Sequence, residues 1–113
     1  MEIKYKIWIE KDGKVVFGKG RDDILSCIED TRSLNAAAKK LKMSYRAAWG
    51  RLKASEERAG MKLVEVDSSE KGMHLTPQAK AIIERFERLD EDVKSLLAKA
   101  SSDFKKLIEK RKR

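Results

Sequence analysis

The sequence predicts a mainly helical fold with two small β-hairpins and one long C-terminal helix. Three observations support this fold class. Residues 33–53 contain two short helical patterns separated by a turn signal. Asp12-Gly13 and the polar run 67–72 each separate two short apolar segments, as hairpin turns do. From residue 78 to the end no glycine or proline interrupts the chain, so one long helix can form there.

The first 18 residues predict a hairpin. Apolar and mostly charged residues alternate over 2–10, which is typical of an opening strand. The apolar face of this strand is formed by Ile3, Tyr5, Ile7 and Ile9. Asp12-Gly13 favours the positive φ values of a tight turn, residues 15–17 return as the second strand, and the glycines at 18 and 20 end the hairpin.

Three helices are predicted between residues 22 and 60. The first runs from Asp22 to about residue 30 and has Cys27 among its apolar residues, as a small core side chain. Asn35 is expected to cap a second helix over 36–41. Ser44 is expected to cap the third, which runs from Tyr45 to about residue 58 and stops at Gly60.

The segments 63–66 and 73–75 flank a polar turn and predict the second hairpin. Thr76-Pro77 then favours a helix start, and a helix from there to about Arg111 would be roughly 50 Å long. Its apolar residues step by four and three, as in a coiled-coil seam. The helix is too long to pack on so small a domain, so we expect it to pair with a second copy of the chain. The expected dimer contacts are Ile82, Phe86, Leu89, Val93, Leu96, Leu97 and Phe104.

The charge distribution favours a polyanionic partner. The formal net charge of the 113 residues is +8. Nucleic acid fits this charge first, while an anionic membrane, an acidic protein or solubility alone are weaker alternatives. Residues 33–53 contain six Lys or Arg and no Asp or Glu, and the chain ends in a basic tail at 110–113. A helix pair with one cationic surface is what a DNA-binding helix-turn-helix requires, and the second hairpin would be its wing.

The second helix of such a pair enters the major groove. Arg46 is the best candidate for base readout, because its guanidinium can bond guanine O6 and N7 together. Tyr45 could contact a phosphate or a thymine methyl group, and Trp49 could either pack or contact DNA. Gly50 would allow close approach of the DNA backbone. The expected DNA contacts are Lys39, Lys42, Ser44, Tyr45, Arg46, Trp49, Gly50, Arg51, Lys53 and, in the wing, Lys71.

Three segments carry a family resemblance, and they occur in the right order and spacing. AAAKKL at 36–41, SYRAAW at 44–49 and LTP at 75–77 resemble the ModE-type molybdate-responsive regulators. The layout also resembles, more loosely, the LysR-type winged-helix domain. The resemblance covers roughly residues 20–100 and implies a DNA-binding domain at 1–76 and a dimerisation helix with a basic tail at 77–113. Molybdate sensing is not implied, because this chain ends where the molybdate-binding domains of those regulators would begin.

We therefore expect a sequence-specific, homodimeric transcription regulator that binds an inverted repeat in double-stranded DNA. The alternatives are a protein-interaction module built on the long helix and a nucleoid-type protein with little sequence preference. One cysteine, one histidine and no nucleotide-binding motif predict neither an enzyme nor a metal or cofactor site. No apolar run reaches about 20 residues and no signal peptide is recognisable, so we expect a cytoplasmic protein without membrane contact. The sequence does not show whether a separate effector-binding partner exists, and no residue points to a ligand site at the dimer seam.

Overall fold

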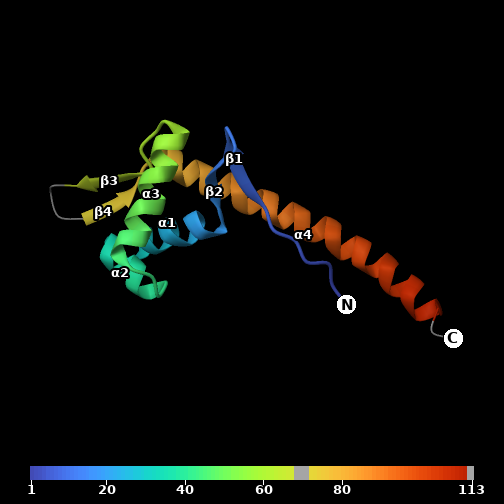
Figure 1. Ribbon diagram of the computed structural model, residues 1–113. Helices are drawn as coiled ribbons and strands as arrows, with labels where there is room; N and C mark the ends of the chain where they lie inside the picture. The colour runs from blue at the N-terminus through green and yellow to red at the C-terminus, as the bar shows by residue number, and fades with distance from the viewer. Residues whose placement is uncertain (68–71, 112–113) are drawn as a thin grey trace.

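The computed structural model describes residues 1–67 and 72–111 (Figure 1). The elements in this part of the chain are β1 (Trp8–Lys11), β2 (Lys14–Gly18), α1 (Lys19–Thr31), α2 (Leu34–Lys40), α3 (Tyr45–Ala59), β3 (Val64–Asp67), β4 (Gly72–Leu75) and α4 (Pro77–Arg111). The predicted fold class, with two hairpins and a long C-terminal helix, is confirmed. The helices α1–α3 form a compact body, and α4 extends from it as a rod (Figure 1).

The first hairpin is shorter than predicted. β1 and β2 pair antiparallel, and the turn between them has positive φ at Asp12 (52°) and Gly13 (78°), as the Asp-Gly signal predicts. Pairing begins only at Trp8, so the prediction of an opening strand from residue 2 is wrong for residues 1–7. These seven residues, here called the N-terminal arm, lie beside α4 instead (Figure 1).

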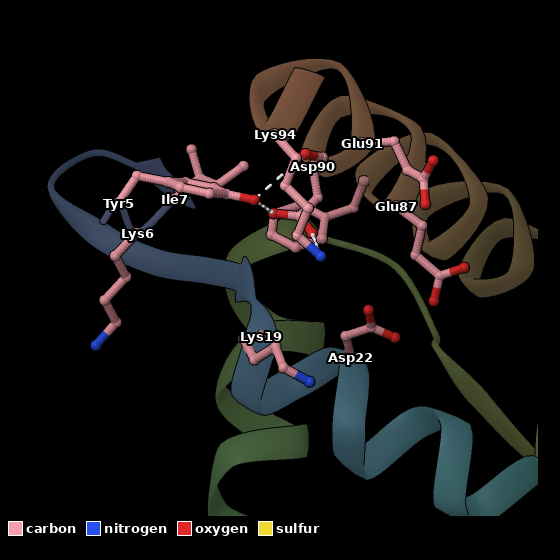
Figure 2. Close-up of a pocket in the computed structure, with 10 residues that line it drawn as sticks. Tyr5, Lys6, Ile7, Lys19, Asp22, Glu87, Asp90, Glu91 and Lys94 are labelled. Carbon is pink, nitrogen blue, oxygen red and sulfur yellow. Dashed lines mark hydrogen bonds and ion pairs between the residues drawn. The ribbon is translucent and has the colours of Figure 1, made fainter. Parts of the chain in front are cut away.

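Hydrogen bonds from Ile3 and Tyr5 hold the N-terminal arm against α4. The Ile3 N–H donates to Ser101 Oγ (3.2 Å), and the Tyr5 hydroxyl donates to Asp90 Oδ1 (2.6 Å; Figure 2). Burial and the Asp90 carboxylate raise the pKa of Tyr5 to about 12, so the phenol stays a donor at neutral pH. The alternating pattern of residues 2–7 therefore serves contacts to a helix and not to a second strand.

The hydrophobic core is built around α1. Its apolar face, which includes Cys27 as predicted, packs on side chains from β2, α2 and α3. Phe17 of β2 and Phe86 of α4 meet edge to face, with ring centroids 5.0 Å apart and an interplanar angle of 74°. This contact anchors the first turns of α4 on the core.

Side-chain caps decide where the helices begin. Ser44 Oγ accepts from the Ala47 N–H (3.0 Å) and Thr76 Oγ1 from the Ala79 N–H (3.1 Å), which confirms the predicted starts of α3 and α4. The prediction of Asn35 as a cap is wrong. Ser33 Oγ accepts from the Ala36 N–H (3.1 Å), so α2 begins at the buried Leu34.

The start of α1 was also predicted too late. The helix begins at Lys19 and includes Gly20, while extended backbone at Gly18 precedes it. Burial of the apolar face that follows outweighs the low helix propensity of Gly20.

The second hairpin is tied to the end of α1. β3 and β4 pair antiparallel, and the Met73 N–H donates to the carbonyl oxygen of Arg32 (2.9 Å). Gly72 has a φ of 67°, and a Cβ atom there would lie 2.5 Å from the same carbonyl oxygen. Only glycine fits this position without displacing the hairpin.

We expect Gly72→Ala to lower the free energy of unfolding by more than about 1 kcal/mol, because the methyl group adds both φ strain and a clash. Gly20→Ala is the control: it is helical, and its Cβ would meet no atom within 4 Å. That variant should gain up to about 1 kcal/mol. Urea denaturation measures both, and equal values for the two variants would contradict the assignment.

Candidate nucleic-acid interface

Small buried side chains set the geometry of the α2–turn–α3 unit. Ala37 and Ala38 of α2 and Ala48 of α3 are buried, which lets the two helices approach closely. The turn between them has Lys42 in the left-handed region (φ 57°) and a hydrogen bond from the Met43 N–H to Ala38 O (3.0 Å). Met43 packs against the core from this turn.

The face of α3 away from the core carries the predicted recognition residues. Arg46, Gly50 and Arg51 are exposed, and so are Tyr45 (51%) and Trp49 (47%). A Cβ atom at Gly50 would meet no atom within 4 Å, so packing inside the domain does not require glycine there. The open surface at Gly50 leaves room for another molecule to approach the helix backbone.

The cations of this face differ in their partners. Lys39, Lys42, Arg46 and Arg51 are exposed, and no ion pair within residues 1–67 and 72–111 involves them. Lys53 instead lies with its Nζ 3.2 Å from Glu56 Oε1 and 5.8 Å from the centroid of the Trp49 ring. The first four are therefore the cations best placed to meet a polyanion. Lys71 and the last two residues of the basic tail lie outside the described residues.

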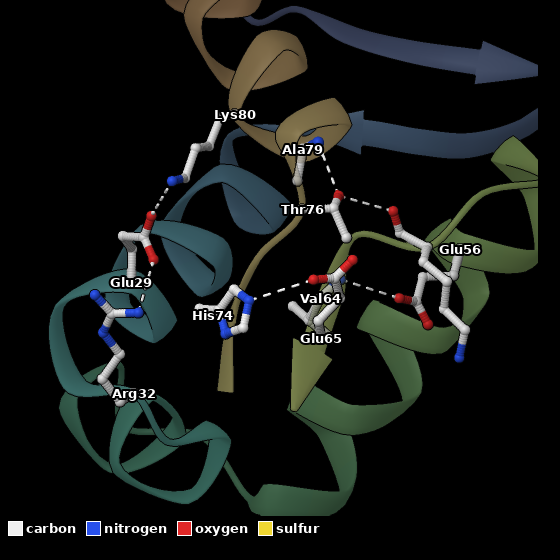
Figure 3. A network of polar contacts seen from close by, with 10 residues as sticks. Glu29, Arg32, Glu56, Val64, Glu65, His74, Thr76, Ala79 and Lys80 are labelled. Carbon is white, nitrogen blue, oxygen red and sulfur yellow. Dashed lines mark hydrogen bonds and ion pairs between the residues drawn. The ribbon is translucent and has the colours of Figure 1, made fainter. Parts of the chain in front are cut away.

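The buried carboxylate of Glu56 ties α3 to the wing hairpin, and sequence reasoning missed it. Glu56 is 8% exposed, and its Oε2 accepts from the N–H groups of Leu63 (2.8 Å) and Val64 (3.3 Å; Figure 3). Burial raises the pKa of Glu56, but these two N–H groups and Lys53 outweigh burial and lower it overall. One sequence signal could have indicated its burial: Glu56 lies four positions after the core residue Leu52 and therefore on the same face of the helix.

Further polar contacts fix α4 to the same segment. The Thr76 hydroxyl donates to Lys62 O (2.9 Å) and the Thr76 N–H to Leu63 O (3.0 Å). On the other side, Glu29 of α1 lies 3.4 Å from Lys80 Nζ at the start of α4 (Figure 3). The recognition helix, the wing hairpin and α4 are thus held in one orientation.

Two arginines join the first hairpin and α1 to the C-terminal half of α3. Arg58 Nη1 donates to Val15 O (2.6 Å), and Arg21 Nε donates to Ser55 Oγ (3.1 Å). Burial, with help from Arg58 and Arg51, lowers the pKa of the Arg21 guanidinium. These side chains therefore serve the fold of the domain.

The predicted dimer residues fall into two groups. Phe86 (6% exposed) lies in the core of its own domain, and Ile82 packs against that core. Val93 and Leu97 are half-buried, whereas Leu89, Leu96 (65% exposed) and Phe104 are open to solvent. Leu107 and Ile108 continue the exposed apolar stripe towards the C-terminal end of α4.

We expect Glu56→Gln to lower stability at pH 7 by about 1–3 kcal/mol, because the charged acceptor of two backbone N–H groups is lost. Since folding lowers the pKa of Glu56, the ionised carboxylate stabilises the fold above the unfolded pKa of about 4.3. This contribution is lost as the pH falls through the folded-state pKa.

The difference in unfolding free energy between wild type and Glu56→Gln should therefore be largest near neutral pH and shrink in acid. Urea denaturation between pH 3 and pH 7 measures it. Glu57→Gln, at the exposed neighbouring position, should differ little from wild type at any of these pH values. A constant difference for Glu56→Gln across the range would contradict this role.

The fold and this cationic face define a winged helix-turn-helix DNA-binding domain. The family model described as bacterial regulatory helix-turn-helix protein, lysR family, matches residues 23–80, which is more than half of the chain. The chain therefore belongs to the LysR family of transcription regulators and is not an enzyme. The looser of the two resemblances seen in the sequence is thus confirmed.

Solved structures of the family share the fold. The DNA-binding domain of CbnR in complex with DNA is 26% identical, with a TM-score of 0.53, over 79% of this chain and 94% of that one. The BenM domain on benA site 1 DNA is 18% identical (TM-score 0.56) over 74% of this chain and 91% of that one. DarR of Vibrio fischeri, in complex with DNA, is 21% identical (TM-score 0.56) over 77% of this chain, which spans only 29% of DarR. No curated protein shows significant sequence similarity to the chain.

A membrane span requires a helix of sufficient length and hydrophobicity. Within residues 1–67 and 72–111, each helix is too short or too polar to cross a bilayer.

Proposed function

We propose that the chain regulates transcription by binding double-stranded DNA sequence-specifically as a homodimer, with α3 in the major groove of each half-site. The observation that carries this proposal is the exposed surface of α2, the turn and the start of α3. Three exposed cations without a partner among the described residues lie there, Lys39, Lys42 and Arg46, and the N-terminal end of α3 is capped by Ser44. The DNA complexes of the related CbnR and DarR proteins agree with this assignment.

The cations divide into two roles. Arg46 is the second residue of α3, close to the end that enters the groove, so we assign it to base readout. Lys39 and Lys42 lie on the preceding helix and turn, and Arg51 lies further along α3. We assign these three to phosphate contacts, which orient the domain without reading sequence. Ser44 Oγ accepts the capping bond and leaves the hydroxyl hydrogen free to donate to a phosphate. Gly50 allows the helix backbone to approach the DNA.

We expect Arg46→Ala to weaken binding to the preferred site by about 1–3 kcal/mol, roughly ten- to a hundredfold, because a bidentate contact to guanine is lost. Binding to unrelated DNA should change much less. Arg88→Ala on α4, where the guanidinium pairs with Glu84 (3.4 Å), should leave both affinities unchanged. Fluorescence anisotropy at fixed salt measures them, and an equal loss on all sequences would show that Arg46 contacts only phosphate.

The homodimer is proposed to form along α4. Beyond Phe86 this helix leaves the core, and its exposed apolar stripe has no partner in the described chain apart from the N-terminal arm on its flank. A second copy of the same stripe matches it in character and length. A twofold dimer would present two recognition helices about 34 Å apart, which favours an inverted-repeat site.

We expect Leu96→Asp to raise the dimer dissociation constant by about a hundredfold, because each protomer loses one buried leucine and gains a charge in the seam. Ser95→Asp is the matched control on the neighbouring exposed position and should leave the dimer intact. Analytical ultracentrifugation measures the dissociation constants. Two variants with equal effects would place the dimer interface elsewhere.

Three finer assignments follow from the same proposal. Residues 1–76 form the DNA-contacting part and 77–113 the dimerisation helix, whose turns up to Phe86 also belong to the core. The match of Ser44–Trp49 and Leu75–Pro77 to their motifs supports kinship with the ModE-type regulators within the family. The protein would act in the cytoplasm, where its DNA target lies.

The proposal is tested by selection from a randomised DNA pool at about 150 mM salt, a concentration at which phosphate contacts alone bind weakly. Enrichment of an inverted repeat, with half-sites about one helical turn apart, would establish a dimeric regulator and identify its operator. Recovery of DNA without a motif would favour a nucleoid-type role. No recovery would favour a protein partner for α4.

A further inference from the structure

Two aromatic side chains form an apolar patch inside the cationic surface of α3. Tyr45 and Trp49 are one helical turn apart, and about half of each side chain is exposed. The core positions of this helix are Ala48 and Leu52, so neither ring belongs to the hydrophobic core. A contiguous exposed apolar patch on the surface that faces a partner indicates contact with apolar groups of that partner.

The indole of Trp49 is held in position. Lys53 Nζ lies 5.8 Å from the ring centroid and 3.2 Å from Glu56 Oε1. The other oxygen of Glu56 accepts from the backbone N–H groups of Leu63 and of Val64, the first residue of β3 (Figure 3). A chain of contacts therefore runs from the wing hairpin to the indole, and a side chain that is already ordered loses little entropy when it binds.

The edges of the bases in the major groove offer one apolar group, the C5-methyl of thymine. The acceptors on these edges can be met by the Arg46 guanidinium, which only donates, whereas the apolar faces of the two aromatic rings suit the methyl group. One helical turn advances about 5.4 Å and one base step about 3.4 Å, so the two rings could reach methyl groups about two base pairs apart.

We propose that Tyr45 and Trp49 read thymine methyl groups beside the base that Arg46 contacts. This inference rests on the proposed function, since it requires α3 to lie in the major groove. It adds that the half-site contains thymine at one or two defined positions, and that removing the methyl group alone reduces affinity. In this reading, a hydrogen-bonding arginine and two apolar rings share the readout of one half-site.

The test uses the operator obtained by selection, in which each thymine of a half-site is replaced in turn by uracil. This exchange removes the methyl group and changes no base-pairing group. Wild type should lose about fourfold in affinity for each methyl group that is read. Trp49→Ala should abolish the loss at one position and Tyr45→Ala at the other, as measured by fluorescence anisotropy at constant salt.

Two controls separate this effect from general damage. Met61→Ala removes an exposed apolar side chain that follows the C-cap of α3, and it should retain the full uracil effect. Circular dichroism and thermal unfolding should show that all variants fold, since the exchanged side chains lie outside the core.

Unchanged affinity of wild type for every uracil-substituted operator would overturn the proposal while leaving the proposed function intact. Persistence of the uracil effect in both alanine variants would also overturn it, because other residues would then contact the methyl groups. Failure to select any operator would instead overturn the proposed function on which the inference rests.

Discussion

The buried carboxylate of Glu56 connects the recognition helix to the wing hairpin and, through Leu63, to the start of α4. A buried acid is costly unless it is hydrogen-bonded, and Glu56 accepts from the N–H groups of Leu63 and Val64 and pairs with Lys53. Leu63 in turn accepts from the Thr76 N–H at the start of α4. One short segment after α3 therefore connects the helix that meets DNA, the wing hairpin and the helix proposed to pair two protomers.

Local signals in the sequence predicted most of the turns and caps that local hydrogen bonds decide, with the cap of α2 at Ser33 as the exception. The caps at Ser44 and Thr76 and the turn at Asp12-Gly13 each satisfy backbone groups within a few residues, so composition and spacing suffice to find them. The prediction of an opening strand from residue 2 was wrong because contacts distant in sequence decide the structure there. An alternating pattern indicates one buried face but not its partner, and residues 1–7 contact Asp90 and Ser101 of α4, more than 80 positions away in sequence.

The sequence predicted which residues lie on the candidate interface, but not which of them are free to contact DNA or a second protomer. The charge pattern predicted that Lys39, Lys42, Arg46 and Arg51 are exposed, because an acid-free helix pair offers its cations no partner of its own. The structure adds two contacts that the charge pattern does not show. Lys53 of the expected DNA contacts lies against Glu56 and Trp49, and Phe86 of the expected dimer contacts packs in the core of its own domain. The contact of Phe86 joins elements distant in sequence, whereas the contacts of Lys53 lie within α3 and depend on which side chains its turns bring together.

The number of residues between Phe86 in the core and the exposed stripe of α4 sets the rotation of the DNA-binding body about the α4 axis. Phe86 faces the core, and the exposed stripe starts three residues later at Leu89 on a neighbouring side of the same rigid helix. Each added residue would rotate the DNA-binding body by about 100° around the α4 axis, whereas seven residues would restore the phase to within about 20°. In the proposed dimer, the number of residues in this part of α4 therefore fixes the angle between the two recognition helices. That angle in turn fixes the spacing of the half-sites that the dimer can bind.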